Sequence, residues 1–155
     1  MRIPDLDQRD RAILAALQDN GRLTNVELAE RANLSPSACL RRLRLLEASG
    51  LVRGYALLLD EKACGKPGTA FVHISLDQQG RQALDAFEAA VEGVPEVMEC
   101  YLLAGEADYL VRVIYSDAAD FERIHTETLT RLPGVVRVHS TLALRTVKRT
   151  TAIPL

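Results

Sequence analysis

The sequence predicts an α+β protein of two domains, in which three helices precede a four-stranded antiparallel sheet with two further helices. In the first third of the chain, apolar residues recur at helical spacing and each helix has a start signal, whereas strand and helix periodicities alternate afterwards. Between these parts lies the polar stretch DEKACGKPG, whose two glycines and one proline are typical of a linker. We therefore expect domains at residues 1–59 and 69–155, joined by a linker at residues 60–68.

Each of the three helices predicted in the first domain has its own start signal. Asp7 is a candidate N-cap for the first helix, which runs to about residue 19. Thr24 and Glu27 have the spacing of a capping box at the start of the second. Ser35 can cap the third helix, in which Pro36 occupies the first position. The tight turn ANLS separates the last two, and together they predict a helix-turn-helix.

Basic residues concentrate around this motif although the formal net charge of the chain is only -2. Six arginines and three acids lie between Arg22 and Arg53. After Gly50, the sequence LVRGYALLLD is strand-like, and we expect a short wing beside the helices. A focused basic patch on such a motif favours binding to nucleic acid.

The third predicted helix has two chemically different faces. One face carries the apolar residues Cys39, Leu40, Leu43 and Leu46. The opposite face carries Ser37, Ala38 and Arg41, with Arg42 and Arg44 on the flanks. Short side chains at the tip and arginines further along suit a helix that enters the major groove and contacts base edges or phosphates. The alternative is an ordinary three-helix module whose arginines form a solvated face.

The second domain has the predicted order β-α-β-β-α-β. Strands are expected at residues 69–76, 97–104, 108–116 and 135–144, and helices at about 82–92 and 121–132. In both halves a proline, one further residue and a valine connect a helix to a strand, at Pro95–Val97 and Pro133–Val135. Two such halves predict a ferredoxin-like sandwich, with both helices on one face of the sheet.

The strand at residues 108–116 has apolar residues on both faces. Leu110 and Ile114 lie on one, opposite a face formed by Tyr109, Val111, Val113 and Tyr115. Because helices can cover only one face, we expect the other to pack against a second copy of the chain. A homodimer would also present two helix-turn-helix motifs to half-sites about one DNA turn, roughly 34 Å, apart.

The loop AGEADY, between the second and third predicted strands, is a candidate site for a zwitterion. Gly105 permits a positive φ and close approach of the backbone. Backbone N–H groups could bind a carboxylate, while Asp108 binds an ammonium group. The alternative is a plain hairpin turn in which Asp108 only caps the loop.

The rest of the composition excludes several classes of protein. No apolar run approaches the roughly 18 residues of a membrane span, and the N-terminus is acidic where a secretory signal is apolar, so we expect a cytoplasmic protein. The three cysteines are far apart and without metal-ligand spacing; we expect them to be reduced, mostly buried and free of metal. No acid pair, phosphate loop or triad indicates an enzyme or a cofactor.

Three stretches of the chain carry a resemblance to a known family. They are LDQRDRAILAALQDNGRLTNVELAERANLSPSACLRRLRLLEASGLVRGY at 6–55, GEADYLV at 105–111 and RLPGV at 131–135. Through them the whole chain resembles the Lrp/AsnC, or feast/famine, family of bacterial and archaeal transcriptional regulators. It is most similar to the leucine-responsive branch, notably through NVELAERANLSPSACLRRLRLLE.

The resemblance implies a winged helix-turn-helix regulator of double-stranded DNA, associated with the nucleoid, that responds to an amino-acid effector such as leucine. It implies homodimers that assemble into octamers, with effector clefts between dimers. The DNA-binding residues that it implies are Ser35, Ser37, Ala38, Arg41, Arg42, Arg44 and Arg53, the last through the DNA backbone. The effector-binding residues are Gly105 and Asp108, with Leu103 and Ser140 on neighbouring strand positions lining the same cleft.

Three points stay open at this stage. Ala107 is small where the family resemblance leads us to expect a bulky aromatic residue, which leaves the identity of the effector undefined. One alternative function is a nucleoid-associated architectural protein that wraps DNA without a small-molecule effector. Another is a metabolic sensor that acts through protein contacts and has a vestigial DNA-binding domain.

Overall fold

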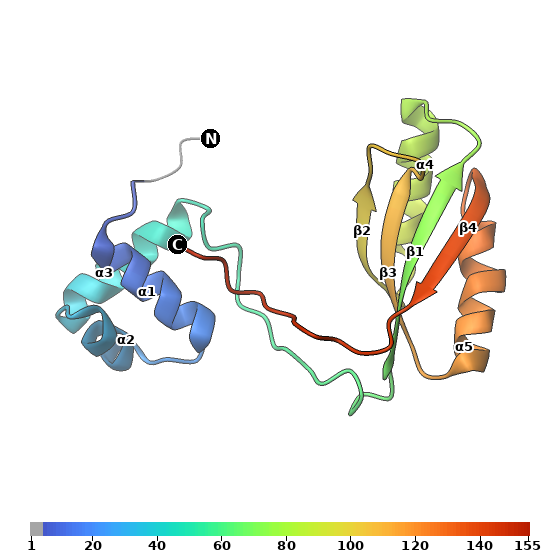
Figure 1. The fold of residues 1–155 in the computed structure, drawn as a ribbon. Helices are drawn as coiled ribbons and strands as arrows, with labels where there is room; N and C mark the ends of the chain where they lie inside the picture. Colours follow the sequence, from blue (N-terminus) through green and yellow to red (C-terminus); the bar gives the residue numbers. More distant parts are fainter. Residues whose placement is uncertain (1–4) are drawn as a thin grey trace. The chain divides into compact units, whose positions relative to one another are not determined.

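The computed structural model describes residues 5–155, so the first four residues of the predicted domain 1–59 lie outside the described residues. The chain forms two compact units, each with its own apolar core (Figure 1). The first contains the residues up to Leu57 together with Lys148–Leu155, and the second is Leu58–Val147. The predicted second domain, 69–155, is thereby divided, because its last eight residues group with the first unit.

Three helices form the first unit: α1 (Gln8–Asp19), α2 (Asn25–Ala32) and α3 (Pro36–Ala48). The three predicted start signals are confirmed, because Asp7, Thr24 and Ser35 each accept a backbone N–H of the first turn. Asn33 ends α2 in the left-handed region, with φ 51°, and so turns the chain into α3. The fully buried Ile13, Leu28 and Cys39 join the three helices in one core. The helix-turn-helix prediction is confirmed.

Two details of the first unit differ from the sequence prediction. Leu40 is 37% exposed, because the buried side of α3 is centred on Cys39 and Leu46 and Leu40 lies about 100° from Cys39 around the helix. The expected wing is not a strand: residues 52–59 are extended, and none of the four strands in the described chain pairs with them. The start of this segment is still bound to the helices, because the Tyr55 hydroxyl donates to Glu47 at 2.9 Å.

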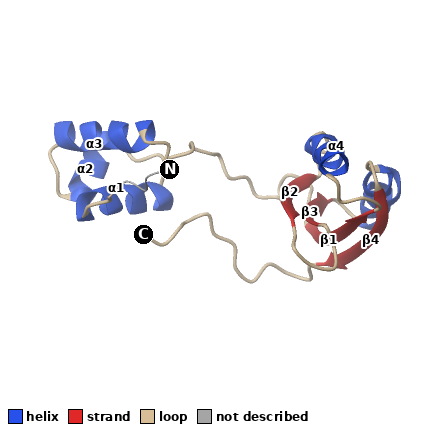
Figure 2. Cartoon of the chain, turned by 90° about the horizontal axis from the view of Figure 1, so that it is seen from above, coloured by secondary structure: helices blue, strands red, loops and turns tan. Residues whose placement is uncertain are grey.

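The second unit is the predicted ferredoxin-like sandwich. Its elements are β1 (Gly68–Leu76), α4 (Arg81–Glu92), β2 (Val97–Leu102), β3 (Tyr109–Tyr115), α5 (Ala118–Arg123) and β4 (Val135–Leu142). The helix that begins as α5 continues through a π-helical turn, Ile124–Thr128, and a 3-10 turn, Leu129–Arg131. The antiparallel sheet has the order β2-β3-β1-β4, and both helices cover one of its faces (Figures 1 and 2). No helix in residues 5–155 is long and apolar enough to cross a membrane.

The two faces of this sheet have different chemistry. On the helix-covered face, alternate residues of β1 and β3 pack against α4 and the helix after α5; examples are Val72, Val111, Phe87 and Ile124. The uncovered face carries Leu110 and Ile114 as predicted, but Arg112 lies between them. This arginine is only 8% exposed, and its Nε donates to Glu99 at 2.8 Å. The face expected to be apolar therefore has a shielded ion pair near its centre.

Candidate functional site

The exposed side of α3 holds the chain's candidate nucleic-acid contacts. Ser37, Arg41 and Arg44 are all exposed and lie on the side opposite the buried Cys39 and Leu46. Among the residues that the structure describes, neither arginine forms an ion pair, so both guanidinium groups are available to an anion. The two arginines lie one helical turn apart, beside a short side chain at the helix tip. Guanidinium groups in this arrangement can donate hydrogen bonds to DNA phosphates and to base edges.

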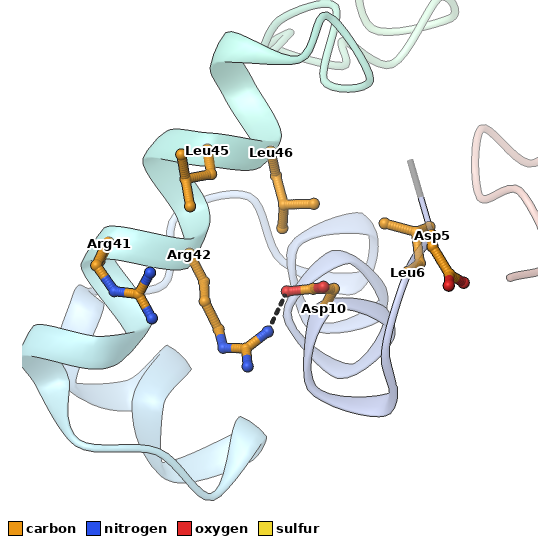
Figure 3. A pocket seen from close by; sticks show the side chains of 7 residues that line it. All are labelled: Asp5, Leu6, Asp10, Arg41, Arg42, Leu45 and Leu46. Atoms are coloured by element: carbon orange, nitrogen blue, oxygen red, sulfur yellow. Dashed lines mark hydrogen bonds and ion pairs between the residues drawn. The ribbon is translucent and has the colours of Figure 1, made fainter. Parts of the chain in front are cut away.

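Arg42 lies in a different environment from its neighbours on α3. Its guanidinium donates to Asp7 at 2.7 Å and to Asp10 at 2.8 Å, and its side chain is 27% exposed. Figure 3 shows it reaching from α3 to Asp10 of α1, beside a small hollow of about 240 Å³ that is also lined by Leu6. The hydrogen bonds that Arg42 donates to Asp10 and, second in size, to Asp7 raise the pKa of Arg42. The geometry joins α3 to α1, a role the sequence did not indicate.

The remaining DNA-binding predictions fall on the ends of α3 and beyond it. The Ser35 hydroxyl accepts the Ala38 N–H at 3.3 Å and lies 3.3 Å from the Ser37 hydroxyl. Ala38 is partly buried, and Arg53 is exposed in the extended segment after α3. Two apolar residues on α3 that the sequence did not mark as contacts, Leu40 and Leu45, are also exposed. Helical spacing alone could have indicated that Leu45 is exposed, because it lies about 80° from Ser37 around the helix.

Asp108 is the most constrained residue of the candidate effector loop. It is 8% exposed, and its carboxylate accepts the Leu76 N–H and the Gln79 side-chain amide, each at 2.7 Å. Its backbone N–H donates to Ile74 at 3.0 Å, and its carbonyl accepts the Leu103 N–H at 2.8 Å. Both carboxylate oxygens are thus engaged within the unit, which is the geometry of the capping alternative. Sequence reasoning missed Gln79, because nothing in DQQG places it beside the loop.

Gly105 contributes open space to the loop. Gly105 does not use the positive φ that a glycine permits, because it is not among the described glycines with positive φ. A Cβ placed on Gly105 would meet nothing within 4 Å. Gly105 is exposed and Ala107 is partly buried, and both have minimal side chains.

The two other effector residues lie at opposite edges of the sheet. Leu103 follows β2, whereas Ser140 lies in β4, and β3 and β1 separate these strands. We expected Leu103 and Ser140 at neighbouring strand positions. The structure does not bring them together within one chain, because they lie at different edges of the sheet. Ser140 pairs with Val72, and its buried hydroxyl oxygen has no hydrogen-bond partner among the described residues.

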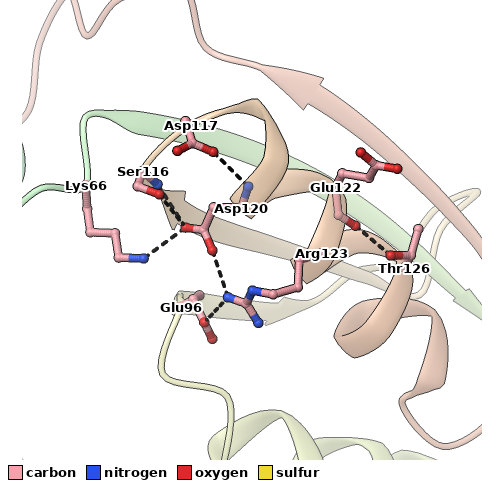
Figure 4. A network of polar contacts seen from close by, with 8 residues as sticks. All are labelled: Lys66, Glu96, Ser116, Asp117, Asp120, Glu122, Arg123 and Thr126. Atoms are coloured by element: carbon pink, nitrogen blue, oxygen red, sulfur yellow. Dashed lines mark hydrogen bonds and ion pairs between the residues drawn. The ribbon is translucent and has the colours of Figure 1, made fainter.

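The predicted linker is fastened to the second unit by polar contacts. Asp120 at the centre of Figure 4 accepts Lys66 Nζ at 2.9 Å and Arg123 at 2.8 Å. The Ser116 N–H, followed by Arg123 and Lys66, lowers the pKa of Asp120 well below its usual range. Arg112 also contacts Glu61 at 3.3 Å. Residues 60–66 are therefore a docked turn. Its Cys64 is exposed, so the expectation of mostly buried cysteines is wrong at this position.

Comparison with known families agrees with both units. Residues 6–53 match a winged helix-turn-helix DNA-binding model, and residues 69–153 match the Lrp/AsnC ligand binding domain. The chain belongs to the Lrp/AsnC family. This is a family of DNA-binding transcriptional regulators with a ligand-binding domain, so the prediction that the chain is not an enzyme is confirmed.

Individual Lrp/AsnC proteins are similar over nearly the whole chain. The leucine-responsive regulatory protein of Salmonella typhimurium is 39% identical over 145 residues, which cover 94% of this chain and 88% of that protein. A Neisseria meningitidis transcriptional regulator solved with L-Met is 44% identical, with a TM-score of 0.92 and 96% of each chain covered. The feast or famine regulatory protein of M. tuberculosis complexed with L-methionine is 34% identical, with a TM-score of 0.85 and 96% and 98% covered.

Proposed function

We propose that this protein is a sequence-specific regulator whose binding to promoter DNA, or whose assembly on it, responds to an amino acid. The observation that carries the DNA-binding part is the exposed side of α3, where Arg41 and Arg44 have no internal ion pair among the described residues. The tip of α3 enters the major groove, and these two arginines contact guanine edges or phosphates.

The other α3 residues take supporting roles in this proposal. Ser35 and Ala38 form the capped N-terminal turn that approaches the DNA backbone, and Arg53 contacts phosphate from the adjoining segment. Exposed Leu40 suits a thymine methyl group, because apolar side chains contact that group in the major groove. Arg42 acts indirectly, because its bonds to α1 set the angle at which α3 is presented.

The effector part rests on the loop after β2 and on the relatives solved with methionine. In our proposal, Asp108 holds the loop in shape, and the backbone N–H groups around Gly105 bind the carboxylate of a free amino acid. Leu103 and Ser140 line the same cleft only if they come from different copies, since they occupy opposite sheet edges in one chain. The side chain that the cleft accepts would then decide between leucine, methionine and other amino acids.

We further propose that the protein works at the nucleoid as a homodimer that assembles into octamers. The uncovered sheet face supplies part of a subunit interface, because Leu110 and Ile114 flank the shielded Arg112 there. Two copies then present their α3 helices to paired half-sites. The alternative function, an architectural protein that wraps DNA, would use the same DNA contacts and differ only in having no small-molecule effector.

Fluorescence anisotropy tests the proposed function. Purified protein is titrated onto the duplex upstream of its own gene at fixed salt, with and without each amino acid of a panel. Saturable binding that one or two amino acids shift is the expected result. Binding that is indifferent to the whole panel would favour the architectural alternative, and binding no tighter than to unrelated duplexes would refute sequence-specific regulation.

A further inference from the structure

The end of the chain is attached to the outer side of α1. The side-chain amide of Gln18 bonds the backbone of Ile153 in both directions: its Nε2 donates to the Ile153 carbonyl at 3.0 Å, and its Oε1 accepts the Ile153 N–H at 2.5 Å. These are the two bonds that a neighbouring strand would make with one residue. The attachment therefore uses the backbone of the C-terminal segment, whatever its side chains are.

The surface that receives this segment is suited to an extended chain. It is a hollow of about 920 Å³ between the exposed side of α1 and Lys148–Leu155. Ala12 and Ala15 are among its lining residues, and small side chains of this kind allow a backbone to come close to the helix. The opposite side of α1 is buried in the three-helix core through Ile13. Helix α1 is thus held from both sides, by the core and by the end of the chain.

This attachment gives the two units a second connection. The first connection is the extended segment before the docked turn, in which Leu57 is 83% exposed. The second is residues 143–147, which leave β4 and lead to the segment on α1; Leu144 is fully exposed within it. A single flexible connection lets its ends vary over a distance of about 5–6 Å times the square root of its length in residues. A second connection excludes most of those arrangements.

We propose that the C-terminal segment, residues 148–155, is an intramolecular clamp on α1 that restricts the orientation of the DNA-binding unit. The inference rests on the proposed function, because restriction matters only when two α3 helices must meet two half-sites at once. Such bivalent binding is strengthened when the second site is presented at the right distance and weakened when the module is free to turn away. The clamp therefore favours paired half-sites and leaves the contact with one half-site unchanged.

Gln18→Ala in the full-length protein tests the clamp. The substitution removes both bonds to Ile153 and leaves a good helix former in α1. Gln8→Ala is the matched control, because Gln8 lines the same hollow and makes no bond to Ile153. A second variant ends at Thr151, which removes Ile153 and keeps the basic Lys148 and Arg149.

Two measurements decide the outcome. Anisotropy should show about tenfold weaker binding of Gln18→Ala and of the shortened chain to a duplex with two half-sites, with unchanged binding to a single half-site. Amide hydrogen exchange, without DNA, should show faster exchange at Ile153 in Gln18→Ala and no change in Gln8→Ala. Equal losses on both duplexes, unchanged affinity on both, or unchanged exchange at Ile153 would each overturn the clamp. A wild-type protein that bound neither duplex would refute the proposed function itself, whereas normal wild-type binding with unaffected variants would refute only the clamp.

Discussion

Arg42 and Arg41 are neighbours in sequence, yet the structure predicts opposite consequences for their loss. Arg42→Ala removes two charge-assisted bonds and leaves Asp10, whose side chain is 16% exposed, without its cation. An unpaired carboxylate at that degree of burial costs about 1–3 kcal/mol, whereas the solvent-screened contact with Asp7 adds little. We expect a loss of about 2 kcal/mol, which lowers the Tm of a unit of this size by about 8–16 °C.

Arg41→Ala should leave the Tm unchanged, because Arg41 is exposed and forms no ion pair among residues 5–155. Its loss should weaken DNA binding by about 1–3 kcal/mol if it contacts a base edge. Thermal unfolding followed by circular dichroism and anisotropy on one duplex measure both quantities for both variants. The reasoning is refuted if Arg42→Ala keeps the wild-type Tm and loses DNA affinity as Arg41→Ala does, since Arg42 would then be a DNA contact.

Three further changes test the second unit. Asp108→Ala should lower the free energy of unfolding of this unit by about 1–3 kcal/mol, measured by chemical denaturation. It should also abolish the effector response and leave the DNA affinity without effector unchanged. Loss of DNA binding as well would contradict this prediction. Because the pKa of Asp120 is lowered in the folded state, its contribution to stability is present above about pH 4 and is lost as the pH falls through the folded-state value. Asp120→Asn should therefore make the free energy of unfolding depend less steeply on pH in the acid range. The same acid dependence in the variant and the wild type would contradict this. Gly68→Ala should lower the Tm, because the added Cβ would overlap the ring of Tyr115 and overpacking costs about 1–3 kcal/mol; an unchanged Tm would show that the ring moves freely.

Local signals in the sequence were sufficient to predict most of the fold. The caps at Asp7, Thr24 and Ser35 are side-chain contacts within one turn, so their residue types and spacing determine them. The strands of the second unit could be predicted equally well, because the alternation of apolar and polar residues shows which side chains face a core. The strand expected after Gly50 does not form in residues 5–155 for the complementary reason: LVRGYALLLD has strand composition, but a strand also needs a partner, and sequence pattern does not supply one.

The candidate site was less predictable, because its details depend on contacts distant in sequence. Helical spacing places Arg42 about 60° from the buried Cys39 and Arg44 about 140° from it, so Arg42 is the nearer of the two to the core. Only the position of Asp10 on α1 shows that the Arg42 guanidinium is bound within the unit. The bonds of Asp108 to residues about thirty positions earlier could not be inferred either. That this loop binds an effector stays a prediction, and the partners of the Asp108 carboxylate became visible only in the fold.

The separation into two compact units limits how an effector can act. Among the described residues, the side-chain bonds of Asp108 in the candidate effector loop are made to Leu76 and Gln79 of the second unit, whereas α3 packs in the core of the first unit. In our proposal, an effector acts on the DNA-binding unit through the covalent connections or through a second copy of the chain. Coupling is reciprocal, so the factor by which an amino acid changes DNA affinity is also the factor by which DNA changes the affinity for that amino acid. Leu57 and Leu144, which are both exposed, lie in these two connections. In our proposal these two segments, more than either folded unit, set the size of the response.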